Sequence, residues 1–270
     1  MPYAQNDDVE IHYEDEGAGR AVLLIHGHTL DRRAGVWIAP ALGQSGLRLI
    51  RPDLRGHGRS TRPDRGYHWS HHAADMTAVL DAVGVDRAAV VGYSLGGGVA
   101  LEMALTVPER VGSLVLLSPV LPDRPFEEVF FANLREVARV IRAEGVAAAM
   151  RGPWLESPLW AGSVIDLRVR QKIDEIVAEF PGAEYLATER DHVERDWIVP
   201  DRLGEIEVPT LVMVGENEMA GFRRFAEEAA SGIPDARLEV LPDLGHVHLL
   251  QAPDRVARKI VEHLGKQFTA

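Results

Sequence analysis

One short stretch constrains the fold of this chain more than any other: an apolar run that meets a serine between two glycines and then continues as a helix. Residues 88–91 are all apolar, Gly92 and Gly96 flank Ser94, and residues 95–107 carry apolar side chains at helical spacing. A buried strand followed at once by a helix puts Ser94 on a sharp bend. Glycine is expected on both sides, because a Cβ so close to the bend would collide with neighbouring backbone. The pattern predicts an exposed nucleophile, but a short motif stays a hypothesis until its context agrees.

Apolar runs of the same kind alternate with helical segments along most of the chain. This order predicts an α/β fold: a mostly parallel sheet with helices on both faces. Residues 9–14 alternate apolar and polar side chains, which predicts an antiparallel strand at one edge. The buried strands are predicted at residues 21–25, 47–50, 88–91, 111–117, 210–214 and 237–241, and the helices at 70–83, 95–107, 127–144, 166–180, 222–230 and 254–263.

The stretch between residues 122 and 205 has a different pattern, with helical segments broken by Gly-Pro and Ser-Pro pairs and without a buried strand. It also contains Trp154, Trp160 and Trp197. We interpret residues 122–205 as a helical cap inserted between two parts of one core, residues 1–121 and 206–270. The alternative is that these helices simply extend the outer layer of the sheet.

Composition removes several classes of function. The chain has 270 residues, 46% of them hydrophobic, which suffices for one large core. The net charge is −12 without a basic stripe, so nucleic acid is not an expected partner. There is no cysteine, which excludes disulfides, thiolate metal sites and a cysteine nucleophile. No apolar run approaches the roughly 20 residues that cross a bilayer, and the N-terminal residues are polar and acidic, so we expect a cytoplasmic protein without a membrane partner.

Residues that directly follow the apolar runs are the candidates for chemistry, because ligands bind beyond the carboxyl ends of the strands in an open parallel sheet. Ser94 is a weak nucleophile until a base removes its proton. His246 follows the run 237–241 in a glycine-containing turn at that edge, so it is the predicted base. His248 is the alternative, and we expect it to pack beside His246.

An acidic side chain must orient the base and stabilise its charged form. Glu218 lies in the loop after the run 210–214 and is the predicted acid. Glu216 in the same loop and Asp123 after the run 111–117 remain alternatives.

Negative charge that develops on a substrate oxygen needs backbone N–H donors. The N–H of Leu95 is available because it opens a helix, where backbone donors lack partners within the helix. The second predicted donor is the N–H of His28, since Gly27 lets the chain turn this amide inward.

Together these residues resemble the α/β-hydrolase superfamily along almost the whole chain. The likeness rests on His26-Gly27, the segment DLRGHGRS at 53–60, residues 92–97, the loop after Val214 and Gly245-His246. It implies an eight-stranded, mostly parallel sheet, a helical cap between the sixth and seventh strands, and a serine mechanism without a cofactor or metal. Most relatives carry aspartate where Glu218 stands, so the acid departs from the pattern. Asp53 and Arg55 are expected to brace loop backbone near the site.

The segment HGHTLDRR at 26–33 is most similar to small serine esterases and lactonases of the 3-oxoadipate enol-lactonase and acyl-homoserine lactonase kind. This resemblance implies hydrolysis of a small carboxylic ester or lactone through an acyl-enzyme. A ligand receptor with slow turnover, a carbon–carbon bond hydrolase and a cofactor-free perhydrolase remain alternatives. The natural substrate and the oligomeric state stay open. We expect an apolar substrate pocket that includes Phe130, Trp154 and Trp160, with Phe126, Phe131, Leu159 and Trp197 as further candidates.

Overall fold

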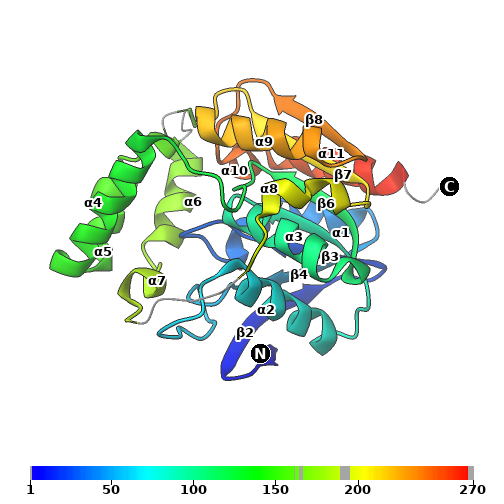
Figure 1. Ribbon diagram of the computed structural model, residues 1–270, viewed down its shortest axis with the longest axis horizontal. Helices are drawn as coiled ribbons and strands as arrows, with labels where there is room; N and C mark the ends of the chain where they lie inside the picture. Colours follow the sequence, from blue (N-terminus) through cyan, green and yellow to red (C-terminus); the bar gives the residue numbers. More distant parts are fainter. Residues whose placement is uncertain (1, 161, 164–166, 189–194, 267–270) are drawn as a thin grey trace.

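Eight strands form a single sheet in the computed structural model, which describes residues 2–160, 162–163, 167–188 and 195–266 (Figure 1). Their order across the sheet is β1-β2-β4-β3-β5-β6-β7-β8. The pairs β1–β2 and β2–β4 are antiparallel and all the other pairs are parallel. The strands are β1 (Tyr3–Asn6), β2 (Val9–Glu16), β3 (Arg20–Ile25), β4 (Leu47–Pro52), β5 (Ala88–Tyr93), β6 (Val111–Leu117), β7 (Thr210–Gly215) and β8 (Ala236–Leu241). The predicted fold class, an eight-stranded and mostly parallel sheet flanked by helices, is confirmed.

The central strands are buried on both faces, which explains their continuous apolar sequences. Every residue of β5 and of β7 is buried. Val90, Leu114 and Val212, on three adjacent strands, are fully inaccessible to solvent. Burying one such side chain stabilises the fold by about 1.5–3 kcal/mol, so the centre of the sheet is the most rigid support available for a catalytic site.

Two helical layers cover the sheet. In one layer α2 (Trp69–Ala82) packs against α3 (Leu95–Thr106), and α9 (Ala220–Gly232) packs on β7 and β8. In the other layer α1 (Ala39–Gln44) packs against α11 (Pro253–Lys266). Figure 1 shows α2, α3 and α9 in front of the sheet. The short α10 (His248–Gln251) directly precedes α11.

The described residues between β6 and β7 form helices joined by loops, without a strand. Figure 1 shows α4, α5, α6 and α7 gathered on one side of the sheet, whereas α8 packs against the core helix α3. These helices are α4 (Glu128–Glu144), α5 (Val146–Ala149), α6 (Leu167–Val177), α7 (Ala183–Leu186) and α8 (Val199–Arg202). The helices expected at 127–144 and 166–180 correspond to α4 and α6, although residue 166 lies outside the described residues. The division into core and cap stays a prediction.

Several short elements, among them β1 and α1, were not predicted because each is too short to show a period. The strand β1 has 4 residues, and the helix α1 has 6 residues including Pro40. Within residues 2–160, 162–163, 167–188 and 195–266, no helix has the length and apolar character that crossing a membrane requires.

Candidate active site

Ser94 lies on the predicted sharp bend between β5 and α3. Its backbone has φ 53° and ψ −114°, a left-handed conformation that residues other than glycine rarely adopt. A Cβ on Gly92 would lie 2.3 Å from the carbonyl oxygen of Gly96, and a Cβ on Gly96 would lie 2.3 Å from that of Ile25. Both glycines are therefore required by close backbone contacts. The Ser94 N–H donates to the Leu117 carbonyl over 2.9 Å, which ties the bend to the end of β6.

Three predicted site residues come together at the carboxyl edge of the sheet. The Oγ atom of Ser94 is 3.0 Å from Nε2 of His246, and Nδ1 of His246 is 2.9 Å from Oε2 of Glu218. All three residues are buried. When Nδ1 carries a proton and donates it to Glu218, the lone pair on Nε2 is free to accept the hydroxyl proton of Ser94. The arrangement can therefore turn a hydroxyl into a nucleophile.

The carboxylate of Glu218 is held by more than the histidine. Its Oε2 also accepts a hydrogen bond of 2.7 Å from the Ser118 hydroxyl, and its Oε1 accepts one of 3.0 Å from the Met219 N–H. Burial acts to raise the pKa of Glu218, but the charge of His246 and the hydrogen bonds from His246 and Ser118 outweigh it and hold the pKa below the usual value. The carboxylate stays ionised at neutral pH. Ser118 was not predicted, although it directly follows β6 at the same edge and the rule applied to the other strands would have found it.

His248 packs beside this group, as predicted, and its polar contact in the described part of the chain is with Ser118. Its Nε2 lies 3.2 Å from Ser118 Oγ, so it donates to a hydroxyl that in turn donates to Glu218. The side chain is fully buried, and burial lowers its pKa from 6.5 to about 4. Within the described residues its Nδ1 has no hydrogen-bond partner. His248 is therefore a neutral histidine that contacts Glu218 indirectly, through the hydroxyl of Ser118.

Neither alternative acid reaches His246. Glu216 is exposed, and its Oε2 accepts a hydrogen bond of 3.0 Å from the Asp243 N–H. Asp123 binds Arg195 over 2.5 Å and the Val199 N–H over 3.1 Å. The structure brings only Glu218 of the three candidates into contact with the histidine.

The two predicted oxyanion donors flank Ser94. Leu95 is the first residue of α3, and His28 lies in the loop after β3. Both line the same pocket as Ser94, and in the described parts of the chain neither backbone N–H donates to a protein acceptor. Two unpaired donors beside a nucleophile suit a developing negative charge.

A cavity of about 230 Å³ opens next to Ser94 and His246. Phe130, Trp154 and Trp160 line it, as predicted. Its wall is mostly apolar and also includes Leu30, Trp69, Val120, Phe126, Leu134, Leu159 and Phe222. The expectation was wrong for Phe131, which is not in this wall, and for Trp197. The indole of Trp197 packs instead against the guanidinium groups of Arg195 and Arg202, each 4.4 Å from the ring centre. In the described ranges no group of three or more His, Asp or Glu side chains is placed to hold a metal ion.

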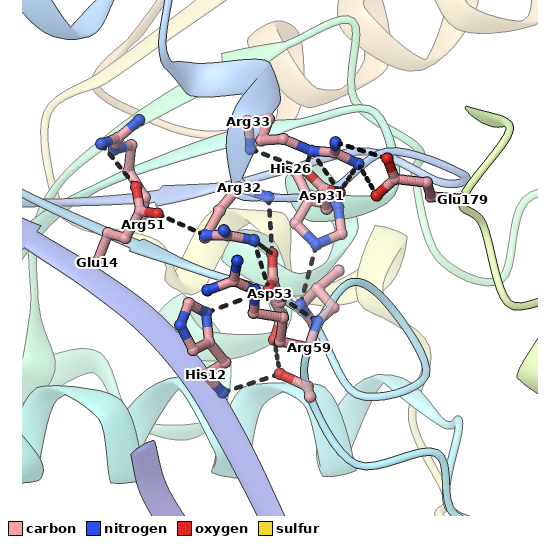
Figure 2. Close-up of polar contacts among 12 residues, drawn as sticks. His12, Glu14, His26, Asp31, Arg32, Arg33, Arg51, Asp53, Arg59 and Glu179 are labelled. Carbon is pink, nitrogen blue, oxygen red and sulfur yellow. Dashed lines mark hydrogen bonds and ion pairs between the residues drawn. The ribbon is translucent and has the colours of Figure 1, made fainter. Parts of the chain in front are cut away.

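A buried polar network braces the loop that carries His28 (Figure 2). Asp53, at the end of β4, accepts hydrogen bonds from the N–H of Arg32 over 2.9 Å and of Arg59 over 3.0 Å. It also pairs with the Arg32 guanidinium over 3.0 Å. The Leu54 N–H donates to Nε2 of His26 over 2.9 Å. The segment 53–60 therefore has the structural role that its sequence suggested.

Arg55 braces the other side of the same segment. Its Nη1 donates to the Gly66 carbonyl over 2.7 Å, and its Nε and Nη2 form a bidentate pair with Asp75. Arg55 therefore ties the segment 53–60 to the loop at Gly66 and to the helix α2.

The sheet topology and the Ser–His–Glu arrangement define a hydrolase of the α/β-hydrolase fold. The chain matches the family described as alpha/beta hydrolase fold over residues 20–253, and it belongs to that family. It is 32% identical over 258 residues to the RutD protein of Azorhizobium caulinodans, named as a carbamate hydrolase, with 94% of each chain covered. It is 30% identical to the non-heme haloperoxidase of Rhodococcus erythropolis, with 91% of this chain and 93% of the relative covered.

Among solved structures, Est816, described as an N-acyl homoserine lactone degrading enzyme, superposes with a TM-score of 0.77 at 30% identity. The match covers 96% of this chain and 98% of Est816. The predicted membership of the α/β-hydrolase superfamily is confirmed.

Proposed function

We propose that this protein hydrolyses a small carboxylic ester or lactone through a Ser94–His246–Glu218 triad. The observation that carries the proposal is the continuous hydrogen-bonded line from Ser94 Oγ through His246 to Glu218, at the floor of an apolar cavity. An apolar wall around a few convergent polar groups is typical of a site for a small organic molecule.

The geometry supports a two-step reaction. Ser94 Oγ attacks the carbonyl carbon while its proton passes to His246 Nε2, and Glu218 stabilises the imidazolium that results. The carbonyl oxygen becomes an oxyanion that the N–H groups of Leu95 and His28 can bind. The intermediate collapses, the alcohol oxygen leaves with the proton from His246, and an acyl group stays on Ser94. A water molecule then attacks this acyl-enzyme, gives its proton to His246, and releases the acid and the free serine.

The proposal is tested with short p-nitrophenyl esters, several lactones and a carbamate, assayed against the wild type and Ser94→Ala. Removing the nucleophile of such a triad costs at least about a thousandfold in kcat. Circular dichroism checks that the variant is folded, and Ser94→Ala with wild-type turnover would refute the assignment. A ligand receptor would give a single burst and a raised melting temperature in place of steady turnover.

A second candidate activity is perhydrolysis of the same acyl-enzyme, favoured by the likeness to the haloperoxidase. Hydrogen peroxide would replace water as the attacking molecule and release a peracid. Halide oxidation that depends on both an added carboxylic acid and Ser94 would support this candidate. A carbon–carbon bond hydrolase would instead consume meta-cleavage diketones, which belong in the same panel.

A further inference from the structure

The pocket contains one carboxylate that the proposed mechanism does not use. Glu184 lies on α7 and lines the cavity with 25% of its side chain exposed. Its Oε1 is 3.1 Å from Nδ1 of His28, whose backbone N–H is the proposed oxyanion donor. The Glu184 carboxylate therefore contacts the side chain of the same residue, His28, whose backbone N–H would bind the reacting carbonyl.

His28 contacts Glu184 and Tyr185 through its two ring nitrogens. Nε2 of His28 is 2.9 Å from the Tyr185 hydroxyl, which has no other hydrogen bond in the described part of the chain. Burial raises the pKa of Tyr185 well above its usual value, so the hydroxyl keeps its proton and can donate it to Nε2. When Nε2 accepts this proton, the ring proton of His28 lies on Nδ1 and is donated to Glu184. In that arrangement the Glu184 carboxylate is the charged group of the three side chains.

The surroundings of this cluster strengthen its effect. The His28 ring makes edge contacts with Trp154 and Phe180, each with ring centres 5.3 Å apart. Among the described residues that line the cavity there is no lysine or arginine. Charges interact more strongly at a partly buried, aromatic site than in water. An anionic substrate would meet repulsion from Glu184 and would find no lysine or arginine among the described residues of the wall.

We propose that Glu184 makes this pocket selective for esters or lactones that carry no anionic group, and that it rejects substrates with a carboxylate on the acyl chain. An uncharged N–H or O–H donor on the substrate can bind the Glu184 carboxylate, whereas a second carboxylate cannot. The inference rests on the proposed ester hydrolysis and adds to it the charge class of the substrate.

Two substrates of equal shape test the proposal. Mono-p-nitrophenyl adipate ends in a carboxylate, and p-nitrophenyl adipamate ends in a primary amide at the same position. We expect the wild type to prefer the amide in kcat/KM by at least about tenfold. Repulsion between the carboxylate of the substrate and that of Glu184 in a partly buried pocket is large enough to lower kcat/KM by this factor. Glu184→Gln is expected to lose most of this preference.

Two further variants separate charge from shape. Glu184→Asp keeps the charge and is expected to keep the preference even if both rate constants fall. Glu175→Gln changes the net charge equally but lies exposed on α6, so it is expected to keep the wild-type ratio. A wild-type ratio near one, or an unchanged ratio in Glu184→Gln, would overturn the proposal.

A binding measurement distinguishes failure of this inference from failure of the proposed function. Ser94→Ala protein is titrated with methyl adipamate and with monomethyl adipate, and binding is followed by the fluorescence of the pocket residues Trp154 and Trp160. Tighter binding of the amide supports the role of Glu184 even if no ester is turned over. Equal binding of the two ligands, or no binding of methyl adipamate, overturns it.

Discussion

Replacing His248 with glutamine tests how much this buried, uncharged histidine makes the free energy of unfolding depend on pH. Burial lowers the pKa of His248 to about 4, against 6.5 for the free side chain. The unfolded chain therefore takes up a proton at a higher pH than the folded protein does. The stability that depends on neutral His248 is fully present above pH 6.5 and is lost as the pH falls toward 4.

The size of the loss follows from these two values. At 1.36 kcal/mol per unit, the penalty is about 1.4 kcal/mol at pH 5.5, about 2.6 kcal/mol at pH 4.5, and at most about 3.4 kcal/mol at lower pH. Glutamine can still donate an N–H to Ser118 but does not titrate. We therefore expect the free energy of unfolding of His248→Gln to fall less steeply with acid than that of the wild type, by about 2.5 kcal/mol between about pH 7.5 and about pH 4.5.

Urea unfolding at several pH values, followed by tryptophan fluorescence, measures this difference directly. Leu249→Ala is the matched control, because Leu249 is buried next to His248 but carries no charge. This control is expected to lower stability by a similar amount at every pH. Other buried histidines, among them His26 and His57, have lowered pKa values and give both proteins a common acid sensitivity. Parallel pH profiles for the wild type and His248→Gln would refute the reasoning.

Three further substitutions test the supports of the site. Ser118→Ala removes a hydrogen-bond donor from Glu218 and should lower kcat about tenfold. The acid limb of the pH–rate profile should also move to higher pH, and stopped assays over a range of pH measure both effects. Gly96→Ala forces a Cβ against the Ile25 carbonyl and should cost at least about 2 kcal/mol in urea unfolding, whereas Gly43→Ala meets no atom within 4 Å and should cost nothing. Asp53→Asn removes one of the two carboxylates, Asp53 and Glu14, that pair with the buried Arg32 and should lower stability by about 3 kcal/mol in the same measurement.

The parts of the fold that followed from the sequence are those with a strong repeating pattern. The strand β6 occupies the residues predicted for it, because a strand buried on both faces is apolar throughout. The helix α4 begins only one residue after its predicted start, since its apolar residues recur at helical spacing. The short helix α7 escaped prediction because 4 residues are too few to show a period. Its residues Glu184 and Tyr185 reach the pocket through tertiary contacts with His28, which no local pattern reports.

The candidate triad was predictable for a topological reason. Ser94, Glu218 and His246 each follow a parallel strand, and the carboxyl ends of parallel strands meet at the same edge of the sheet. The choice of Glu218 over Glu216 was less constrained, because both lie in one loop. What separates them is the direction of the side chain, which depends on the backbone turn after β7 and on Ser118 across the sheet.

Ser118 also offers a physical reason why the acid of this site can be a glutamate, where the resemblance to the superfamily implied an aspartate. The acid must bind His246, yet Glu218 places the same oxygen within hydrogen-bond distance of both His246 and a hydroxyl at the end of β6. The extra methylene lets the carboxylate span the ends of two strands, and the Ser118 N–H is itself tied to the Met213 carbonyl of β7 over 2.8 Å. His248 completes the support by donating to Ser118. We expect a shorter aspartate at the same backbone position to lose one of these two partners, so Glu218, Ser118 and His248 form one unit that orients the base.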